Sequence, residues 1–379
     1  MRTRRLNTSR TLVVASASAR PFVQAATAAG YRVVALDAFA DADTRAHAAE
    51  THALEYRDGG FDANALDTVL SGLKSTAPLG LVYGSGFELQ PALLTLAEQY
   101  MPLIGNSVRV VRNMKRALTF FALLDVLNIP HPAVRLQQLS QEDMANASWL
   151  LKKGGGSGGT HIRRLTQNAA PGPGSYYQQE MQGIPVSLLF VADGVRAQVV
   201  GFNQQWLAPT PEMPYRYGGA VSHAEMPATA RKQLLQAAQK LTGAVGLRGL
   251  NSLDAIMHDG RIWVLELNPR LTATFDLYPA PDGGLFQLHL DACRGNIGQW
   301  PKLAEQARAH YIFYAPEGFR LPADFDWPDW VADVPRAADT ISAGEPVCTV
   351  TAEAATAAGA VALMAERVRQ LIDGLKQAC

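Results

Sequence analysis

The sequence predicts an α/β fold with a parallel sheet at the N-terminus, a mixed α+β region in the middle and a smaller β-rich part at the C-terminus. Apolar runs alternate with helical segments over residues 11–105, as in a parallel sheet whose strands are joined by helices. A strand-like run at residues 149–152 then leads directly into a glycine-rich loop. Residues 250–268 contain two strand-like runs around an Asp-Gly pair, which is the signature of a tight hairpin.

Length and composition limit the classes of protein to consider. A chain of 379 residues is expected to form two or three domains. We place them at residues 1–106, 107–300 (with a small lid near 130–182) and 301–379. Lysine and arginine together number 34, as do aspartate and glutamate. A chain without net charge is not typical of a general nucleic-acid binder, so we expect no nucleic-acid partner.

Neither a membrane span nor a secretory leader is predicted. No apolar run approaches the ~18 residues of a membrane helix. Residues 1–5 are basic and residues 12–15 are apolar, but this apolar run is too short for a signal peptide, and a first strand behind a basic tail is favoured. The three cysteines, too scattered for a disulfide framework or a metal site, are Cys293, Cys348 and Cys379. We therefore expect a cytoplasmic protein with no membrane partner.

The N-terminal part is expected to contain four strands, at residues 12–15, 32–36, 79–83 and 103–104. A helix over residues 21–29 has a proline in its first turn and a glycine at its end. This succession is the βαβ pattern of a parallel sheet.

Polar residues follow these strands. Asp37 comes directly after the second strand, as in dinucleotide-binding folds, but residues 16–20 lack the Gly-x-Gly-x-x-Gly turn, which disfavours nicotinamide binding. Ser16, Ser85 and Glu88 also follow strand ends, where ligands of α/β proteins bind. Helix caps or turns explain these three residues equally well.

A helix is expected over residues 107–128, with Lys115 inside it. Two prolines within residues 128–132 end this helix, since proline cannot continue it. Residues 134–151 then predict a strand, a helix and a second strand.

The glycine-rich loop is the first candidate binding element. Lys152 ends a strand, and five glycines and one serine follow: Gly154, Gly155, Gly156, Ser157, Gly158 and Gly159. Such a loop has no side chains that keep a phosphate away, and its backbone N–H groups can bind oxygen atoms. It is not a P-loop, because the lysine precedes the glycines. A flexible linker is the alternative interpretation, and Lys153 could replace Lys152 as the binding lysine.

Two further strands are expected at residues 187–192 and 197–201, joined by an Asp-Gly turn. Residues 204–207 and 215–220 combine polar and aromatic side chains and are expected in loops. Arg216 in the second of them would either hold a substrate carboxylate or lie on an ordinary surface rim.

The hairpin within residues 250–268 is the second candidate binding element. Glu266 and Asn268 are two residues apart, so on a strand their side chains leave the same face. The hairpin would place Asp254 beside Glu266, and Arg270 follows two residues after Asn268. Two carboxylates and an amide oxygen on one face suit Mg²⁺ carrying a phosphate chain. An ordinary hairpin with a polar outer face is the alternative.

Of the remaining segments, residues 271–278, directly after Arg270, are expected to line a substrate pocket. The other segments carry no predicted chemistry. His289 lies in an expected helix over residues 285–293, where a lone histidine is more often structural than catalytic. The other expected elements are a helix at 228–244, short strands at 311–314 and 346–350, and a terminal helix at 352–376.

Taken in order, these motifs resemble the ATP-grasp superfamily. The order is Lys115 in a helix, Lys152 before the glycine-rich loop, residues 177–181 (YQQEM), two acids, and Asn-Pro-Arg at 268–270. Within the superfamily the chain is most similar to the group described as predicted ATP-dependent carboligases related to biotin carboxylase. The likeness covers roughly residues 105–295.

The resemblance implies an ATP-grasp fold behind a Rossmann-like N-terminal domain that helps to hold the acceptor substrate. The resemblance also implies roles for the motif residues. Lys115, Lys152 and the glycine-rich loop would bind the phosphates, while Gln178 or Gln179 and the backbone of Met181 would contact the adenine. Asp254, Glu266 and Asn268 would hold Mg²⁺ (or Mn²⁺), and Arg270 and Lys152 would steady the reacting phosphate. Residues 183–187 lack the glutamate that commonly holds the ribose.

The favoured function is an ATP-dependent carboxylate–amine ligase that forms an acylphosphate and releases ADP and phosphate. Its partners would be a small carboxylate and a small amine. Relatives suggest that the protein forms a homodimer. They also suggest a place in the biosynthesis of one-carbon carrier cofactors of the methanofuran or methanopterin type. The first alternative is a bicarbonate-dependent carboxylase, although the chain has no Met-Lys-Met biotin-attachment sequence. The second is a non-enzymatic nucleotide-binding sensor, which would not need both acids and the asparagine.

Overall fold

The structure is a computed structural model that describes residues 10–165 and 170–378. The basic tail at 1–5 and Cys379 lie outside the described residues. Within them, no helix is long and apolar enough to cross a membrane.

The N-terminal part forms the predicted parallel sheet. Its strand order is β3-β2-β1-β6-β7, with β1 Thr11–Ser16, β2 Arg32–Asp37, β3 Glu50–Ala53, β6 Leu81–Tyr83 and β7 Leu103–Ile104. Every residue of β1 is buried, which explains why the strand reads as a continuous apolar run. The surrounding helices are α1 Arg20–Ala28, α2 Ala42–His47, α3 Ala63–Leu73 and α4 Ala92–Glu98, and a small hairpin joins β4 Tyr56–Arg57 to β5 Gly60–Phe61.

The single helix expected over residues 107–128 is in fact two helices. Helix α5 (Val108–Lys115) is separated from α6 (Ala117–Val126) by Arg116, whose backbone is extended at φ −91° and ψ 116°. Arginine is a good helix former, so this break has no local signal in the sequence. Its effect is to place Lys115 at the very end of α5.

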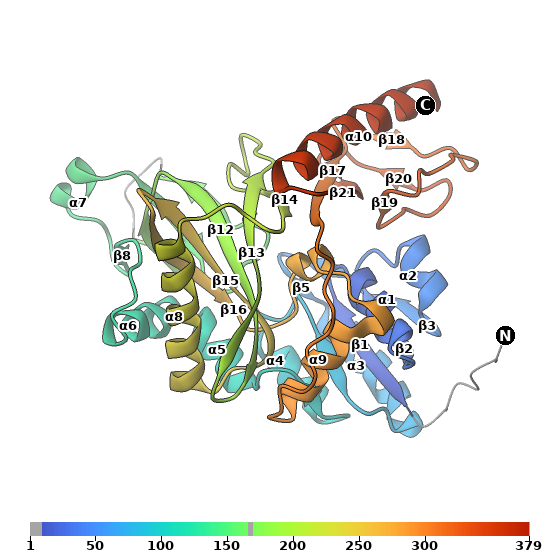
Figure 1. The fold of residues 1–379 in the computed structure, drawn as a ribbon, viewed down its shortest axis with the longest axis horizontal. Helices are drawn as coiled ribbons and strands as arrows, with labels where there is room; N and C mark the ends of the chain where they lie inside the picture. The colour runs from blue at the N-terminus through green and yellow to red at the C-terminus, as the bar shows by residue number, and fades with distance from the viewer. Residues whose placement is uncertain (1–9, 166–169, 379) are drawn as a thin grey trace.

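A small separate sheet follows, with strand order β10-β9-β11-β8. It consists of β8 Val134–Arg135, β9 Trp149–Lys153, β10 Ile162–Arg164 and β11 Ser175–Gln179, with helix α7 Gln141–Asn146 between β8 and β9. Ser140 and Asp143 form a capping box at the start of α7. The glycine-rich loop joins β9 to β10, and in Figure 1 α7 and β8 project at the far left of the molecule.

An eight-stranded sheet with strand order β16-β15-β12-β13-β14-β17-β21-β19 forms the centre. Its strands are β12 Ile184–Asp193, β13 Ala197–Leu207, β14 Tyr217–Val221, β15 Arg248–His258, β16 Arg261–Asn268, β17 Ala307–Tyr314, β19 Val331–Ala332 and β21 Pro346–Ala354. Residues 204–207, expected in a loop, belong to β13, and most of 215–220 belongs to β14. Pairing across a sheet stabilises polar segments whose sequence does not alternate.

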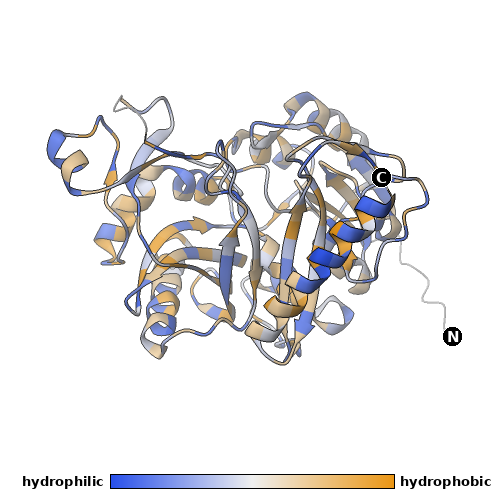
Figure 2. Cartoon of the chain, turned by 90° about the horizontal axis from the view of Figure 1, so that it is seen from above, coloured by the Kyte–Doolittle hydropathy of each residue, from blue (hydrophilic) through white to orange (hydrophobic). Residues whose placement is uncertain are grey.

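Helices cover the sheets. Helix α8 (Ala228–Val245) ends at Gly246 as predicted and packs on the central sheet, and α10 (Ala357–Ala378) packs on β17 and β21. Figure 1 shows the N-terminal sheet at the lower right and α10 above it. In Figure 2 the helix that ends at the C-terminus alternates hydrophilic and hydrophobic residues, as expected for a helix with one buried face. A short two-stranded sheet pairs β18 Phe319–Arg320 with β20 Thr340–Ile341.

His289, expected to be structural, connects the two large sheets. It lies in α9 (Gly284–Cys293), where its Nδ1 accepts the N–H of Leu250 at 3.0 Å and its Nε2 lies 3.2 Å from the carbonyl oxygen of Ile104. Leu250 belongs to β15 and Ile104 to β7, so one buried ring ties the N-terminal sheet to the central one.

Candidate functional site

The hairpin of β15 and β16 brings the predicted metal ligands together. Asp254 pairs directly with Glu266, and Ser252 pairs with Asn268, so all four side chains lie on one face. The Asn268 amide nitrogen donates to Asp254 at 2.9 Å and to Glu266 at 3.3 Å. The Ser252 hydroxyl donates to the other Asp254 oxygen at 3.0 Å.

Lys115 reaches this cluster from the end of α5. Its Nζ donates to the Asn268 side-chain oxygen at 2.6 Å and lies 3.4 Å from Glu266. The Lys115 side chain is only 5% exposed, so its charge is balanced inside the protein by this pair. The break at Arg116 is what allows the helix end to point there.

These charges set the protonation of the two acids. Burial and the neighbouring Glu266 raise the pKa of Asp254. Burial would also raise the pKa of Glu266, but the charges of Lys115 and Lys152 outweigh it and hold that pKa below its ordinary value. An adjacent divalent cation would bring Asp254 into its ionised form as well.

The donor set fits Mg²⁺, which prefers carboxylate and amide oxygens. Among the described residues no group of three or more histidines, cysteines, aspartates or glutamates could hold a metal ion. The predicted set differs from such a group because its third member is an amide. The amide oxygen of Asn268 is engaged by Lys115, so binding a cation through it requires Lys115 to move toward another anion.

Lys152 and Gln178, one of the predicted adenine residues, lie on one face of the small sheet. Lys152 is 5% exposed, and its Nζ donates to the Gln178 side-chain oxygen at 3.1 Å. Burial lowers the pKa of Lys152. The Gln178 amide nitrogen is buried and has no hydrogen-bond partner within the described part of the chain. A buried donor without a partner in the protein can be satisfied by a ligand.

The glycine-rich loop requires glycine at specific positions. Gly155 has φ +81°, and a Cβ there would come within 2.5 Å of the Glu88 carbonyl oxygen. Gly159 has φ +70°, and a Cβ there would overlap the carbonyl of Tyr215. The loop therefore lies against the N-terminal part and against the segment before β14, in a conformation that a flexible linker would not need.

Residues 114–274 match the family model described as ATP-grasp domain. The chain carries an ATP-grasp domain. No curated protein sequence matches the chain.

Solved structures share the whole architecture. Rhizobium etli pyruvate carboxylase T882A matches with a TM-score of 0.73 and 16% identity over 94% of this chain, but this chain spans only 37% of the carboxylase. The biotin carboxylase domain of Hydrogenobacter thermophilus 2-oxoglutarate carboxylase, in complex with MgADP, ADP and bicarbonate, matches with a TM-score of 0.71 and 12% identity over 93% of this chain and 88% of that one. The L-amino acid ligase of Bacillus licheniformis matches with a TM-score of 0.67 and 14% identity. This match covers 94% of this chain and 96% of that one. At these identities the likeness establishes a common fold.

Arg270 follows the last strand of the ATP-grasp domain and is held in place by Glu88. Its Nε forms an ion pair with Glu88, and its Nη1 donates to the Leu271 carbonyl at 2.8 Å. Burial would raise the pKa of Glu88, but Arg270 and Lys115 outweigh it and lower that pKa. Glu88 thus links the N-terminal sheet to the ATP-grasp domain and orients Arg270 between them.

Asn106 fixes the backbone just before Arg270. Its amide nitrogen donates to the Pro269 carbonyl at 3.0 Å and to Asn251 at 2.8 Å, and its oxygen accepts the Arg248 N–H at 2.9 Å. Asn106 could not be predicted from the sequence, because an asparagine after a short strand carries no distinguishing pattern.

The predicted adenine residues are not all on one face. Gln179 is adjacent to Gln178, so strand alternation turns its side chain to the opposite face, away from Lys152. Met181 lies partly buried just beyond β11. Glu180, between them, accepts a hydrogen bond from Tyr215.

His161 also lies at the site, although the sequence did not predict it. It follows the glycine-rich loop, and a Cβ at Gly156 would overlap its ring, which explains why glycine is needed at that position. Its Nδ1 is buried with no partner among the described residues. Burial and the nearby Lys152 lower the pKa of His161 to about 4, so the ring is neutral at pH 7. The only sequence signal was its place two residues beyond the loop.

The guanidinium of Arg216 has partners within the protein. It donates to the carbonyls of Ala208 at 2.8 Å and Gly344 at 3.1 Å, and it lies 3.6 Å from the centroid of the Tyr314 ring. These contacts make Arg216 a structural link between β14 and the C-terminal strands.

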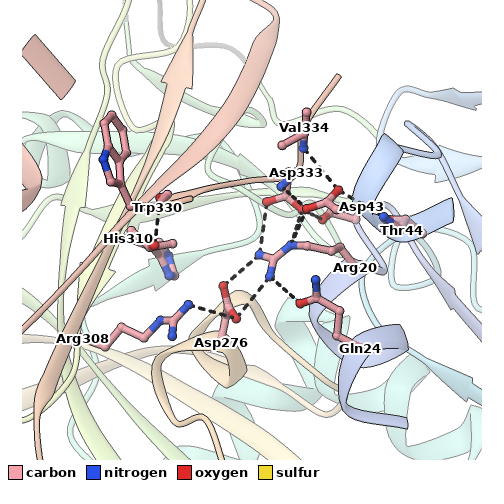
Figure 3. Close-up of polar contacts among 12 residues, drawn as sticks. Arg20, Gln24, Asp43, Thr44, Asp276, Arg308, His310, Trp330, Asp333 and Val334 are labelled. Atoms are coloured by element: carbon pink, nitrogen blue, oxygen red, sulfur yellow. Dashed lines mark hydrogen bonds and ion pairs between the residues drawn. The ribbon is translucent and has the colours of Figure 1, made fainter. Parts of the chain in front are cut away.

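A cavity opens beside the ATP-grasp domain, and we name it the Arg20 cavity. One wall contains Ser157, Gly158 and Arg270, and the opposite wall comes from the N-terminal sheet and the C-terminal strands. Figure 3 shows Arg20, from α1, lying among Asp43, Asp276 and Asp333 at this place. Because the glycine-rich loop and Arg270 line it, the cavity is contiguous with the candidate phosphate site.

Proposed function

We propose that this protein is an ATP-dependent carboxylate–amine ligase that produces ADP and phosphate. The observation that carries the proposal is the meeting of Lys115 with Asp254, Glu266 and Asn268 beside the glycine-rich loop and Lys152. Cations that can hold phosphate oxygens thus lie beside oxygen ligands that can hold a metal, and the neighbouring glycine-rich loop also lines the Arg20 cavity. This is what phosphoryl transfer requires of a protein.

The site residues take the following roles in this proposal. Lys152 and the backbone N–H groups of the glycine-rich loop hold the phosphate chain, and the free amide nitrogen of Gln178 binds the base. Asp254, Glu266 and Asn268 would hold Mg²⁺, which would neutralise the negative charge that develops during phosphoryl transfer. Lys115, which donates to Asn268 in this structure, would bind a phosphate oxygen when Asn268 holds the cation.

The chemistry proceeds in two displacements. A substrate carboxylate oxygen attacks the γ-phosphorus of ATP, the bond to the β–γ bridging oxygen breaks, and ADP leaves. A neutral amine then attacks the acyl carbon of the acylphosphate, the C–O bond to phosphate breaks, and the amine loses a proton to give the amide. Arg270, already oriented by Glu88, stabilises the charge on the acylphosphate oxygens.

The comparisons support this class of reaction. The L-amino acid ligase matches nearly the full length of both chains. The match to a carboxylase domain that contains MgADP and bicarbonate supports an alternative function, a carboxylase that activates bicarbonate by the same first step. A place in one-carbon carrier cofactor biosynthesis stays a prediction from the sequence resemblance.

ATP turnover with Mg²⁺ against a panel of amino acids, amines and bicarbonate tests the proposal. We expect ADP and phosphate to appear only with the correct acceptor. Glu266→Gln should reduce turnover by at least about a hundredfold, since it removes a metal ligand, whereas Glu366→Gln on the exposed face of α10 should not. AMP with pyrophosphate would contradict the acylphosphate route, and bicarbonate-dependent ADP release without an amine would favour the carboxylase.

A further inference from the structure

The Arg20 cavity has an apolar middle and a strongly acidic end. Phe22, Phe39 and Ile312 line it together with Ser157 and Arg270 of the phosphate side. The acidic end lies away from the glycine-rich loop, where α1, α2 and the C-terminal strands meet.

Arg20 cancels only part of the acidic charge. Its guanidinium is 5% exposed and pairs with Asp333 at 2.9 Å and with Asp276 at 2.8 Å, and it lies 3.8 Å from Asp43. Figure 3 shows the three carboxylates arranged around this one guanidinium, with Arg308 lying against Asp276 from the other side. The Asp37 carboxylate has donors of its own, because it accepts hydrogen bonds from the backbone N–H groups of Ala19, Phe39 and Ala40.

Asp41 is the member of this group that has no partner. It is only 8% exposed, and it lines the cavity. Throughout residues 10–165 and 170–378, no group donates a hydrogen bond to its carboxylate. Although Asp41 stands at the N-cap position of α2, its side chain does not cap the helix. A buried acid without a donor is costly to keep, which is a reason to look for a ligand.

The groups that face Asp41 are mostly anionic. They are Asp37 on β2, Asp43 on α2 and Asp333 after β19, with Arg20 on α1 as the nearby cation and the buried thiol of Cys348 on β21. Burial and the three neighbouring acids raise the pKa of Asp41 to about 9. Arg20 is already committed to other carboxylates, so an additional cation is what this end of the cavity lacks.

We propose that the Arg20 cavity binds a cationic nitrogen of the acceptor substrate, with Asp41 as its counter-ion. This rests on the proposed ligase function, and it specifies the substrate class as an amine or amino acid that carries a protonated nitrogen. The apolar middle accommodates the carbon chain, and the reacting group lies at the Arg270 end. Binding a cation converts neutral Asp41 to the carboxylate, and the released proton passes to solvent.

Calorimetric titration of the full-length protein saturated with MgADP tests the proposal. The cationic probes are L-lysine, 1,5-diaminopentane and 1-aminopentane, and the matched uncharged and anionic probes are 1-pentanol and hexanoate. We expect at least one cationic probe to bind at least tenfold more tightly than 1-pentanol and hexanoate do. Asp41→Asn should weaken that probe tenfold or more, and Asp373→Asn on exposed α10 should change it less than twofold.

Proton release on binding gives a second measurement, made first on the wild-type protein. Titrations of the wild-type protein at pH 7.5 in buffers of different ionisation enthalpy should show release of about one proton for each cation bound. In Asp41→Asn the release should vanish, and circular dichroism and MgADP affinity should match the wild type.

Each outcome decides the proposal. The proposal would be overturned if 1-pentanol or hexanoate bound as tightly as the cationic probes, or if Asp41→Asn kept the wild-type affinity. It would also be overturned if no cationic probe bound to a protein that binds MgADP. A wild-type protein that does not bind MgADP would instead overturn the proposed ligase function.

Discussion

At the scale of single residues, the candidate site combines paired charges with buried polar atoms that have no partner in the described part of the chain. Lys115 and Arg270 each have a carboxylate partner. The Gln178 amide nitrogen and His161 Nδ1, both at the phosphate side, lack partners among the described residues. Unsatisfied buried groups are costly in an empty protein and useful in a liganded one.

Asp41 should lower the stability of the unliganded protein in a pH-dependent way. Its pKa is about 9 in the folded state and about 3.9 in the unfolded chain, so between these values the folded state binds one more proton and stability falls as pH rises. We therefore expect Asp41→Asn to be more stable than the wild type by at least about 1 kcal/mol at pH 8, with the difference vanishing below about pH 4. Urea unfolding at pH 4, 6 and 8 measures this; a constant difference across that range would contradict it.

At the scale of elements, the glycine-rich loop joins β9 to β10 and contacts three other parts of the chain. Its glycines lie against the Glu88 carbonyl, the Tyr215 carbonyl and the His161 ring. Such close approach leaves no space for a Cβ, so the loop depends on glycine more than on any side chain.

Gly155→Ala should impair nucleotide binding while the rest of the protein stays folded. The left-handed φ of +81° and the contact with Glu88 both oppose a methyl group, so the loop must rearrange. We expect ADP affinity to fall tenfold or more, which is about 1.4 kcal/mol. Gly172→Ala is the matched control, because a Cβ there meets nothing within 4 Å. Equal affinities of the two variants, measured with a fluorescent nucleotide, would show that the loop does not hold the phosphates.

At the scale of the whole molecule, a few buried polar residues connect parts that are far apart in the chain. The Arg270–Glu88 pair joins residues 182 positions apart, and Arg20 and Asp333 are 313 positions apart. Asn106 and His289 tie the N-terminal sheet to β15. These links hold the walls of the Arg20 cavity in their relative positions.

Arg20→Met should destabilise the whole fold at neutral pH by about 3 kcal/mol, because it leaves buried carboxylates without their counter-ion. Burial would raise the pKa of Asp276, but Arg20 and Arg308 hold it below its ordinary value. The pair therefore stabilises the protein above about pH 4, and its contribution is lost as the pH falls further.

The difference between Arg20→Met and the wild type should consequently shrink as the pH falls below about 4. Arg369→Met, on an exposed position of α10, should change stability by less than about 0.5 kcal/mol. Chemical unfolding at pH 7 and pH 3.5 distinguishes these expectations, and an equally destabilised Arg369→Met would show a general rather than a specific effect.

The sequence alone determined the features that depend on local pattern. The alternation of apolar runs and helices predicted the parallel N-terminal sheet, and the Asp-Gly turn predicted the pairing of Asp254 with Glu266. Side-chain direction on a strand has a period of two, and turn chemistry acts over a few residues, so neighbouring residues carry this information. Where local preference was misleading, as at Arg116 and residues 204–207, packing against other elements prevailed.

Only the tertiary structure decided which distant residues meet. The pairing of Glu88 with Arg270, the burial of His161, the structural use of Arg216 and the unpaired state of Asp41 depend on how sheets from opposite ends of the chain pack together. The charge of a side chain is visible in the sequence, but its partners and its exposure to water are not. Those two quantities set the cost of burying a charge, and therefore which residues remain free to bind a ligand.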